Sequence, residues 1–314
     1  MPNYNGVWSL STHYQAIGNQ SWAGFISGGD LGIFMGGTGG HSVARGFISI
    51  SSLGDETNFA TLSATINNSS GSGSSTRGII AKTTPDANSI SFITVNSKGD
   101  LVDFGDRTVS ANGPASLSSA TRAVFCGDTQ ATDVIDYVTI ASTGNASDFG
   151  NATVVIVGSS SGCGSTTRGL ILGGETSPND TNVIQYITIA SAGNASDFGD
   201  LTAAKQQVQS VSNSIRAVRG GGNGDTNVMD YVTIASAGNA QDFGDLSVGR
   251  RGIFLGNCAN STRGIFAGGD GASGDIAIID YITIASTGNA QDFGDLIGNS
   301  EKGAALSDCH GGLA

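Results

Sequence analysis

The stretch Tyr281-Ile282-Thr283-Ile284-Ala285-Ser286-Thr287-Gly288-Asn289-Ala290-Gln291-Asp292-Phe293 decides the fold of this 314-residue chain, because copies of it recur along the sequence. Each copy opens on an aromatic residue and closes on a phenylalanine twelve residues later. The closing residues are Phe59, Phe104, Phe149, Phe198, Phe243 and Phe293, at successive spacings of 45, 45, 49, 45 and 50 residues. Tandem units of this length indicate a repeat architecture in which each unit buries its apolar faces against its neighbours.

Each repeat carries the signals of four short strands. In the last repeat we expect these strands at about Gly252–Gly256, Arg263–Ala267, Ile279–Ala285 and Ala290–Leu296. The Ser-Thr-Gly-Asn-Ala joint before the fourth strand is typical of a β-hairpin, because Gly and Asn readily adopt positive φ angles. Four antiparallel strands in a unit of this length correspond to one blade of a β-propeller. The sequence therefore predicts an all-β protein whose residues 23–314 form a six-bladed β-propeller of four-stranded blades.

The end of the chain offers a way to close the ring. After the sixth repeat, residues 302–309 have the pattern of a first strand, but no second strand follows it. We expect this C-terminal segment to become the innermost strand of the first blade and so to close the ring. Residues 23–29 compete for the same position.

The repeats resemble kelch repeats. A glycine pair ends the second strand at Gly36-Gly37, Gly173-Gly174, Gly221-Gly222 and Gly268-Gly269. A tyrosine follows in the third strand, and a large aromatic residue opens the fourth, which is Phe here where kelch proteins usually carry Trp. The glycine pair is lost at Lys82-Thr83 and halved at Gly127-Asp128. The resemblance covers roughly residues 23–312 and implies kelch-like blades.

Composition and charge exclude several classes of partner. The formal net charge is −12 with 14 Lys and Arg residues, so the chain repels phosphate backbones and we expect no nucleic-acid partner. No run reaches the roughly 18 apolar residues that a membrane span needs, so we expect no membrane insertion. The start of the chain lacks the charged and apolar regions of a secretory signal, which predicts synthesis in a cytoplasm without export by that route.

Polar residues that recur once per repeat have structural interpretations. We expect the arginines at Arg77, Arg122, Arg168, Arg216 and Arg263 to bridge neighbouring blades. The triplet Asp-Phe-Gly recurs with its aspartates at Asp103, Asp148, Asp197, Asp242 and Asp292. Kinases use this triplet to hold Mg²⁺, but their other motifs are missing, so we expect these aspartates to accept backbone or arginine hydrogen bonds at blade corners. Calcium binding by the repeated aspartates is the alternative.

No catalytic or metal-binding pattern stands out. The histidines His13, His41 and His310 lie in no nucleophile motif, and Cys126, Cys163, Cys258 and Cys309 have no metal-ligand spacing. We interpret the cysteines as small core residues. The sequence therefore predicts a protein that is not an enzyme and has no catalytic residue, no cofactor and no bound metal. A propeller enzyme that degrades glycans is the alternative, because paired carboxylates have no fixed sequence signature.

Residues 1–22 differ in kind from the repeats. They contain Gly6-Val7-Trp8-Ser9-Leu10-Ser11, followed by Tyr14 and Trp22. This opening resembles a short segment of bacteriophage tail and virion proteins, and the repeated unit resembles repeats in proteins of marine bacteriophages. The resemblance implies a virion protein made in the host cytoplasm, whose residues 1–22 dock it to a neighbouring virion subunit through Trp8, Tyr14 and Trp22. Alternatively, the tryptophans plug one end of the propeller.

The connection between the second and third strands is where the repeats differ in length. From the arginine to the aromatic residue there are 15 positions in repeats two, three and five, but 18 in repeats four and six. Loops that vary on a constant frame are the usual place for binding. The candidate binding residues are Glu175, Thr176, Asn179, Asp180, Asn223, Asp225, Asp270, Ser273 and Asp275. Loops without a binding role are the alternative.

These features together predict a bacteriophage virion structural protein, in a tail fibre, at a tail tip or on the capsid surface. Its expected partners are other virion proteins, through the N-terminal segment, and a host-surface glycan or protein, through the propeller. Self-association into a homo-oligomer stays open. A purely architectural adaptor between virion proteins and the glycan-degrading enzyme are the alternatives.

Overall fold

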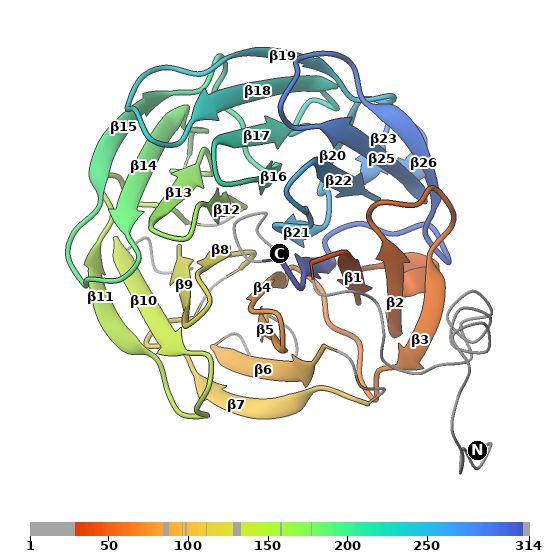
Figure 1. Cartoon of the computed structure of the whole chain (residues 1–314), viewed down its shortest axis with the longest axis horizontal. Coiled ribbons are helices and arrows are strands. Elements are labelled where there is room, and N and C mark those ends of the chain that lie inside the picture. The colour runs from red at the N-terminus through yellow and green to blue at the C-terminus, as the bar shows by residue number, and fades with distance from the viewer. Residues whose placement is uncertain are drawn as a thin grey trace, which may run out of the picture.

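A computed structural model describes residues 29–83, 88–95, 97, 99–110, 112–127, 133–157, 159–176 and 178–309 of the chain. Among these residues the regular elements are β-strands, apart from one 3-10 turn at Gly39–His41. Most strands belong to four-stranded antiparallel arrangements, and Figure 1 shows these arrangements grouped around a common centre. The fold is all-β, as the repeated pattern predicts, and its sheets are consistent with a β-propeller.

Repeats two to five each form four consecutive strands, the first innermost (Figure 1). In the second repeat these are β4 Ser70–Gly73, β5 Arg77–Ala81, β6 Ser89–Thr94 and β7 Val102–Asp106. In the third they are β8 Ala115–Ser118, β9 Arg122–Cys126, β10 Val134–Thr139 and β11 Ser147–Asn151. The fourth has β12 Ser161–Gly164, β13 Arg168–Leu172, β14 Val183–Thr188 and β15 Ser196–Asp200, and the fifth has β16 Gln209–Ser212, β17 Arg216–Gly220, β18 Val228–Thr233 and β19 Gln241–Asp245.

The two ends of the described chain share a sheet. The first repeat contributes β1 Leu31–Met35, β2 Ala44–Ser49 and β3 Thr57–Thr61. Beside β1 lies β27 Ala304–Ser307, in antiparallel pairing. The carboxylate of Asp308 accepts the backbone N–H groups of Gly29 and Leu31, at 2.8 and 2.9 Å. The C-terminal segment therefore occupies the inner position next to β1, while residues 23–28 lie outside the described residues.

The last repeat departs from the prediction in its first strand. It contains β22 Arg263–Ala267, β25 Ile278–Thr283 and β26 Gln291–Asp295. The expected first strand is reduced to β21 Leu255–Gly256, which lies parallel to β4 and β27. The residues just before it form β20 Arg250–Arg251 and pair with a small hairpin of β23 Asp270–Gly271 and β24 Gly274–Asp275. The longer second-to-third connection of this repeat supplies that hairpin, which draws β20 toward it.

The hairpin turn of one repeat hydrogen-bonds to the outer strand of the repeat before it. Gly238 N donates to Phe198 O at 2.7 Å, and Asn239 Oδ1 accepts the N–H of Asp200 at 3.1 Å. Equivalent backbone bonds run from Gly144 N to Phe104 O, Gly193 N to Phe149 O, Gly288 N to Phe243 O and Gly54 N to Phe293 O. The last of these joins the first repeat to the sixth. The recurring Gly-Asn pair is thus explained by contact between repeats, in addition to the turn itself.

Gly199, the glycine of one Asp-Phe-Gly triplet, shows how tight this contact is. Its φ angle is 142°, and a Cβ atom there would lie 2.5 Å from the carbonyl carbon of Gly238. We expect Gly199→Ala to lower the free energy of unfolding by about 1–3 kcal/mol, the usual cost of holding a non-glycine residue in such a conformation. Gly193→Ala is the matched control, because nothing lies within 4 Å of a Cβ there. Denaturant titration of both variants checks the expectation, and an equal loss at the two positions would contradict it.

The once-per-repeat arginine bridges to the next repeat, which confirms that expectation. Arg168 lies over the ring of Tyr186, 4.5 Å from its centre, and donates to Ile234 O at 2.8 Å. Equivalent bonds run from Arg77 to Ile140 O, Arg122 to Ile189 O, Arg216 to Ala285 O and Arg263 to Ile50 O. The tyrosine therefore orients the guanidinium by a cation–π contact while the carbonyl ties two repeats together.

The expectation for the aspartate of Asp-Phe-Gly is wrong. That residue is exposed in all five copies, whereas the phenylalanine after it is buried. Successive side chains of a strand point to opposite faces, so burying the phenylalanine turns the aspartate toward solvent. Three buried carboxylates lie instead in the third strands, at Asp136, Asp230 and Asp280.

Each of these buried carboxylates pairs with a buried arginine. The pairs are Arg107–Asp136 at 3.0 Å, Arg219–Asp230, and Arg250–Asp280 at 2.9 Å. The fourth repeat has Gln185 at the corresponding position, and its Oε1 accepts the hydroxyl of Thr153 at 2.8 Å. Repeats one and two have Gly46 and Ser91 there. A charge occurs at this position only where an arginine reaches it, as the cost of burying an unpaired charge requires.

Candidate binding face

The variable loops and the linkers between repeats lie at the same end of the sheets. Adjacent strands run in opposite directions, so the second and fourth strands of a repeat both end on one face. The second-to-third loops at 36–43, 173–182, 221–227 and 268–277 therefore share this face with the linkers at 201–208, 246–254 and 297–303. We call this surface the loop face.

The candidate residues of the fourth and fifth repeats contact one another. Glu175 and Asp180 form an antiparallel bridge across the fourth-repeat loop. Within that loop the N–H and the hydroxyl of Thr176 both donate to Asn179 O at 2.8 Å. Asn223 Nδ2, from the fifth repeat, donates to Asp180 Oδ2 at 2.6 Å. Residues predicted from two separate loops thus form one polar cluster.

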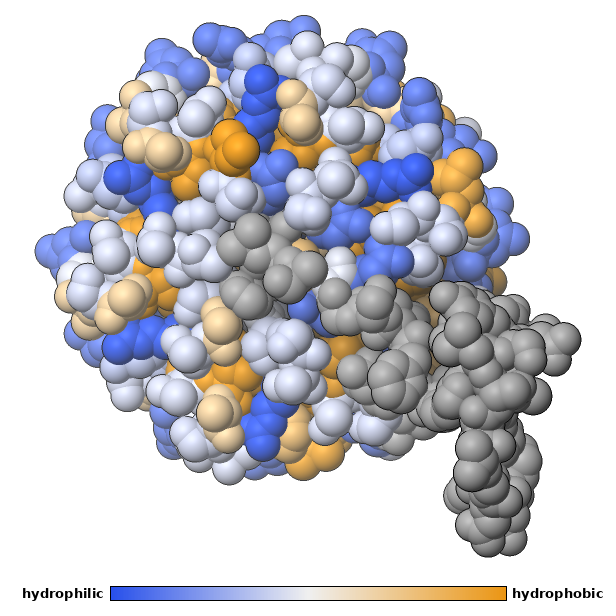
Figure 2. Space-filling view, in the orientation of Figure 1, coloured by the Kyte–Doolittle hydropathy of each residue, from blue (hydrophilic) through white to orange (hydrophobic). Residues whose placement is uncertain are grey.

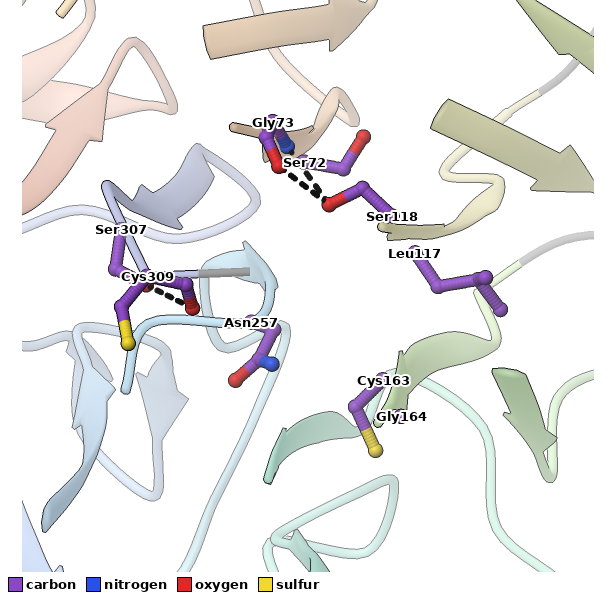
Figure 3. Close-up of a pocket in the computed structure, with 9 residues that line it drawn as sticks. All are labelled: Ser72, Gly73, Leu117, Ser118, Cys163, Gly164, Asn257, Ser307 and Cys309. Carbon is purple, nitrogen blue, oxygen red and sulfur yellow. Dashed lines mark hydrogen bonds between the residues drawn. The ribbon is translucent and has the colours of Figure 1, made fainter. Parts of the chain in front are cut away.

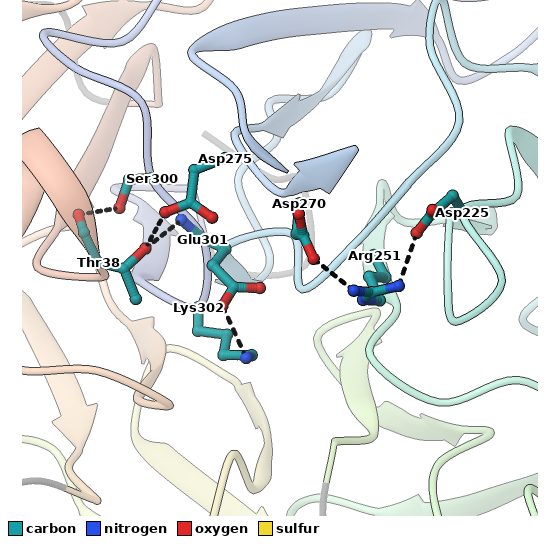
Figure 4. Close-up of polar contacts among 8 residues, drawn as sticks. All are labelled: Thr38, Asp225, Arg251, Asp270, Asp275, Ser300, Glu301 and Lys302. Carbon is teal, nitrogen blue, oxygen red and sulfur yellow. Dashed lines mark hydrogen bonds and ion pairs between the residues drawn. The ribbon is translucent and has the colours of Figure 1, made fainter. Parts of the chain in front are cut away.

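Arg251 joins the loops of the fifth and sixth repeats. Its guanidinium lies 3.0 Å from Asp225 Oδ1 and 2.6 Å from Asp270 Oδ2, as Figure 4 shows. The arginine side chain is 40% exposed, so each ion pair contributes at most about 1 kcal/mol to stability. The bridge therefore serves mainly to orient the two loops.

A second set of contacts joins the sixth repeat to the first. Thr38 Oγ1 donates to Asp275 Oδ2 at 2.6 Å and accepts the N–H of Glu301 at 3.1 Å. Ser300 Oγ donates to Thr38 O at 2.9 Å, and Lys302 Nζ lies 2.7 Å from Glu301 Oε1 (Figure 4). The loop face is therefore cross-linked between these repeats by polar side chains.

The structure brings together most of the predicted binding residues, and their binding role stays a prediction. Eight of them take part in the contacts just described, whereas Ser273 is exposed in the β23–β24 turn. Sequence reasoning missed the loop residue Thr38 and the linker residues that contact the loops, which are Lys205, Arg251, Ser300, Glu301 and Lys302. The antiparallel topology carried the missing signal, because it sends every linker to the face of the variable loops.

Backbone hydrogen bonds link one residue of each linker to the next at the centre of the loop face. The bonds run Gly113 N to Asn68 O, Ser159 N to Gly113 O, Gln207 N to Ser159 O, Gly252 N to Gln207 O and Lys302 N to Gly252 O, at 2.7–3.1 Å. All six residues have positive φ angles, between 47° and 63°. The backbone N–H and carbonyl groups of these residues hydrogen-bond to one another, so the linkers are held together at the centre of the face.

The inner strands also contact one another at their far ends, on the opposite side of the sheets from the loop face. Ser118 Oγ donates to Gly73 O at 2.7 Å, and Ser212 Oγ donates to Gly164 O at 2.8 Å. A cavity of about 10 Å³ remains between the strands, with Cys163, Asn257 and Cys309 among its lining residues (Figure 3). That volume holds about one water molecule. This cavity is therefore too small for a substrate.

The four cysteines form no disulfide and are buried, in agreement with the core role predicted for them. Burial raises the pKa of Cys163 to about 11, and burial together with the carboxylates of Asp308 and Asp30 raises the pKa of Cys309 to about 12. A thiol reacts as its thiolate, so both are unreactive in the folded protein. We expect an aromatic disulfide reagent to modify none of the four thiols in the native protein at about pH 8 and all four in denaturant. Rapid modification of the native protein would contradict this.

His41 lies in a buried contact between the first and sixth repeats. Its Nδ1 is 2.8 Å from Gly36 O, and its Nε2 is 2.9 Å from both carboxylate oxygens of Glu56. Glu56 also accepts the N–H of Ile297 at 3.0 Å. Burial by itself would lower the pKa of His41, but the hydrogen bond to Glu56 and its negative charge outweigh burial and raise that pKa. This histidine is thus a structural residue of the described fold.

The raised pKa of His41 makes part of the stability depend on pH. A group whose pKa is raised by folding stabilises fully below its unfolded value, near 6.5 for histidine, and this contribution is lost as the pH rises through the folded value. We therefore expect His41→Gln to lower the melting temperature more at about pH 6 than at about pH 9. Thermal melts of both proteins across this range check the sign. If the difference in melting temperature between the two proteins grows as the pH rises, the pKa of His41 is not raised by folding.

The docking residues Trp8, Tyr14 and Trp22 lie outside the described residues. Within the described part of the chain, no group of three or more His, Cys, Asp or Glu residues is arranged to hold a metal ion. In that same part, no helix has the length and apolar character needed to cross a membrane.

Comparison with known proteins identifies the fold and no family. No family model matches the chain, and no curated protein matches it. A solved structure described as "Structure of YjhT" is similar to it, with a TM-score of 0.67 and 11% sequence identity, over 86% of this chain and 95% of that one. At this identity the likeness concerns the fold alone. It supports the propeller-type architecture of the chain.

Proposed function

We propose that this chain is a six-bladed propeller, closed by its C-terminal segment, that serves as a structural and recognition protein of a bacteriophage virion without enzymatic activity. The observation that carries the proposal is the loop face, where polar side chains from successive repeats are tied into one surface. The cavity between the far ends of the inner strands has room for about one water molecule. Such an arrangement suits display of a rigid surface better than turnover of a substrate.

Three contacts between the first and sixth repeats support the six-bladed closed ring. Strand β27 pairs with β1, Gly54 N donates to Phe293 O at 3.0 Å, and Arg263 donates to Ile50 O at 3.1 Å. The last two repeat the bonds that join other successive repeats. The first and sixth repeats are thus joined as neighbours, which is what closure by the C-terminal segment requires.

The chemistry of the loop face favours shallow, polar recognition. Its carboxylates are Glu175, Asp180, Asp225, Asp270, Asp275 and Glu301, and its cations, apart from the buried Arg250, are Lys205, Arg251 and Lys302. Elsewhere on the surface, on the face that Figure 2 shows, apolar residues form small areas separated by polar ones. Recognition of a host-surface glycan or protein, or of a neighbouring subunit, would therefore rest on hydrogen bonds spread over the face, with modest affinity for each contact.

The virion assignment rests on the resemblance of residues 1–22 and of the repeated unit to bacteriophage proteins. In this proposal residues 1–22 attach the protein to the particle, and the propeller faces outward. An antibody raised against the purified chain should label intact particles of the phage that encodes it. Deleting residues 1–22 should remove the labelling while the truncated protein keeps its cooperative melting transition. Unlabelled particles, or labelling that survives the deletion, would rule the proposal out.

A further inference from the structure

The outer rim carries a shallow groove that the fold does not explain. It lies at the hairpin between β25 and β26, which are outer strands in Figure 1, and has a volume of about 170 Å³. The residues lining it are Tyr281, Ile282, Thr283, Ser286, Thr287, Gly288, Asn289 and Gln291. They offer hydroxyl groups, amides and one aromatic ring, and none carries a charge at neutral pH.

The hydrogen-bonding groups of this groove are oriented in advance. Asn289 Oδ1 accepts the N–H of Asp245 at 3.1 Å, which leaves the two Nδ2 protons of Asn289 for an outside acceptor. The hydroxyl of Tyr281 donates to Gln291 Oε1, which leaves the tyrosine oxygen as an acceptor and Gln291 Nε2 as a donor. Arg263 lies 4.6 Å from the centre of the tyrosine ring and restrains it. Groups fixed in this way lose little entropy when a ligand binds.

Most of the lining recurs in repeats three to five, where the turn residues and the threonine are exposed, the tyrosine is partly buried and the residue after it is buried. The fifth repeat supplies Tyr231, Val232, Thr233, Ser236, Ala237, Gly238, Asn239 and Gln241, and the hydroxyl of its tyrosine donates to the glutamine at 2.8 Å. Repeats three and four have Ser147 and Ser196 at the place of the glutamine. The contact between repeats explains the glycine and the asparagine. The serine occurs in all six repeats, where its N–H donates to the carbonyl three residues earlier, so the tyrosine hydroxyl and the glutamine distinguish the grooves of repeats five and six.

The first two repeats lack this chemistry. Their opening aromatic residues are Phe47 and Phe92, which have no hydroxyl group, and the turn residues after them differ from the shared sequence. They therefore serve as internal references. A phenylalanine at the tyrosine position is compatible with the fold, because Phe92 packs edge-on against Phe104 as the tyrosines pack against their own phenylalanines.

We propose that these rim grooves, in repeats five and six above all, bind uncharged sugar units of a polysaccharide. Hydroxyl groups and amides that both donate and accept match the alternating donors and acceptors of a sugar ring. The net charge of −12 disfavours anionic polymers. Equivalent grooves on neighbouring repeats engage one polymer together, so shallow individual sites give useful avidity. This site is separate from the loop face and from residues 1–22. Sugar binding at the rim can therefore be tested independently of the proposed virion role.

Affinity electrophoresis of the full chain in gels containing dextran, mannan or alginate tests the proposal. We expect one of the two neutral polymers to retard the native protein in proportion to its concentration. Ser236→Arg with Ser286→Arg fills the two grooves from exposed positions and should weaken this retardation at least about tenfold. Ser52→Arg with Ser97→Arg is the matched control, because it adds the same charge at the equivalent exposed positions of the first two repeats.

A second variant tests the chemistry of the groove at nearly constant shape. Tyr231→Phe with Tyr281→Phe removes only two hydroxyl groups and should weaken retardation several-fold while the melting temperature is unchanged. The proposal is overturned if neither dextran nor mannan retards the protein, or if only alginate does. It is equally overturned if both arginine pairs reduce retardation alike, or if the groove-filled variant binds as well as the native chain.

Discussion

Removal of residues 302–314 is expected to abolish the cooperative unfolding of this protein. The deleted segment contains β27, whose residues Ala304, Ala305 and Leu306 are completely buried. Without it the inner edge of β1 and the apolar residues around Leu306 face water, and the carboxylate contacts of Asp308 disappear. Loss of the leucine burial alone costs about 1.5–3 kcal/mol. Together with the lost strand pairing, this is a large part of the roughly 5–15 kcal/mol that stabilises a typical domain.

Circular dichroism during heating measures this prediction directly. The truncated chain should give a broad, shallow transition, whereas the full chain should give a sharp one. A synthetic peptide covering residues 300–314 should restore part of the sharp transition when added in excess, because it supplies the same strand in a second molecule. A truncated chain that melts as sharply and at the same temperature as the full chain would show that β27 does not close the ring.

Replacing Arg250 by methionine is expected to destabilise the fold by about 3–5 kcal/mol, the usual result of removing one partner from a buried ion pair. The guanidinium is fully buried, lies 2.9 Å from Asp280 Oδ2 and donates to Phe266 O at 3.2 Å. Burial lowers the pKa of Arg250, and the charge of Asp280 opposes that shift. Methionine has a similar length and no charge, so the carboxylate stays buried without its counter-ion.

The chain itself provides the control for this substitution. The fourth repeat has Gln185 at the position of Asp280 and has no arginine paired with it, so a neutral amide is accepted there. The double variant Arg250→Met with Asp280→Gln should therefore recover at least half of the lost free energy of unfolding, as measured in denaturant. If the double variant is no more stable than Arg250→Met alone, the loss comes from packing and the unpaired charge is not its cause.

Local patterns in the sequence predicted the elements of this fold well. The alternation around Tyr281 and Phe293 indicated two strands joined by a tight turn, and β25 and β26 lie there. The bridging role of Arg168 and its equivalents was also predicted correctly, whereas the same reasoning failed for the exposed aspartate of Asp-Phe-Gly. Regular spacing conveys this kind of information, since equivalent positions of a repeat share equivalent surroundings.

The partners of irregular residues required the tertiary structure. Arg107, Arg219 and Arg250 all reach carboxylates at one repeat position, yet they come from three different places in their repeats, so no periodicity marks them. The same holds for Arg251, which bridges the loops of two repeats from a linker between them.

The repeated unit from Tyr281 to Phe293 shows which features the sequence determines and which depend on tertiary contacts. By itself the sequence determined that Tyr281 to Phe293 is a hairpin and that its copies form similar sheets, because strand alternation and turn chemistry are local. Only the tertiary structure decided that the Gly-Asn turn hydrogen-bonds to the outer strand of the preceding repeat. It also decided that Asp292 faces solvent and that an uncharged groove opens beside Tyr281. Those features depend on which surfaces meet when the sheets pack, and that is set by contacts between residues far apart in the chain.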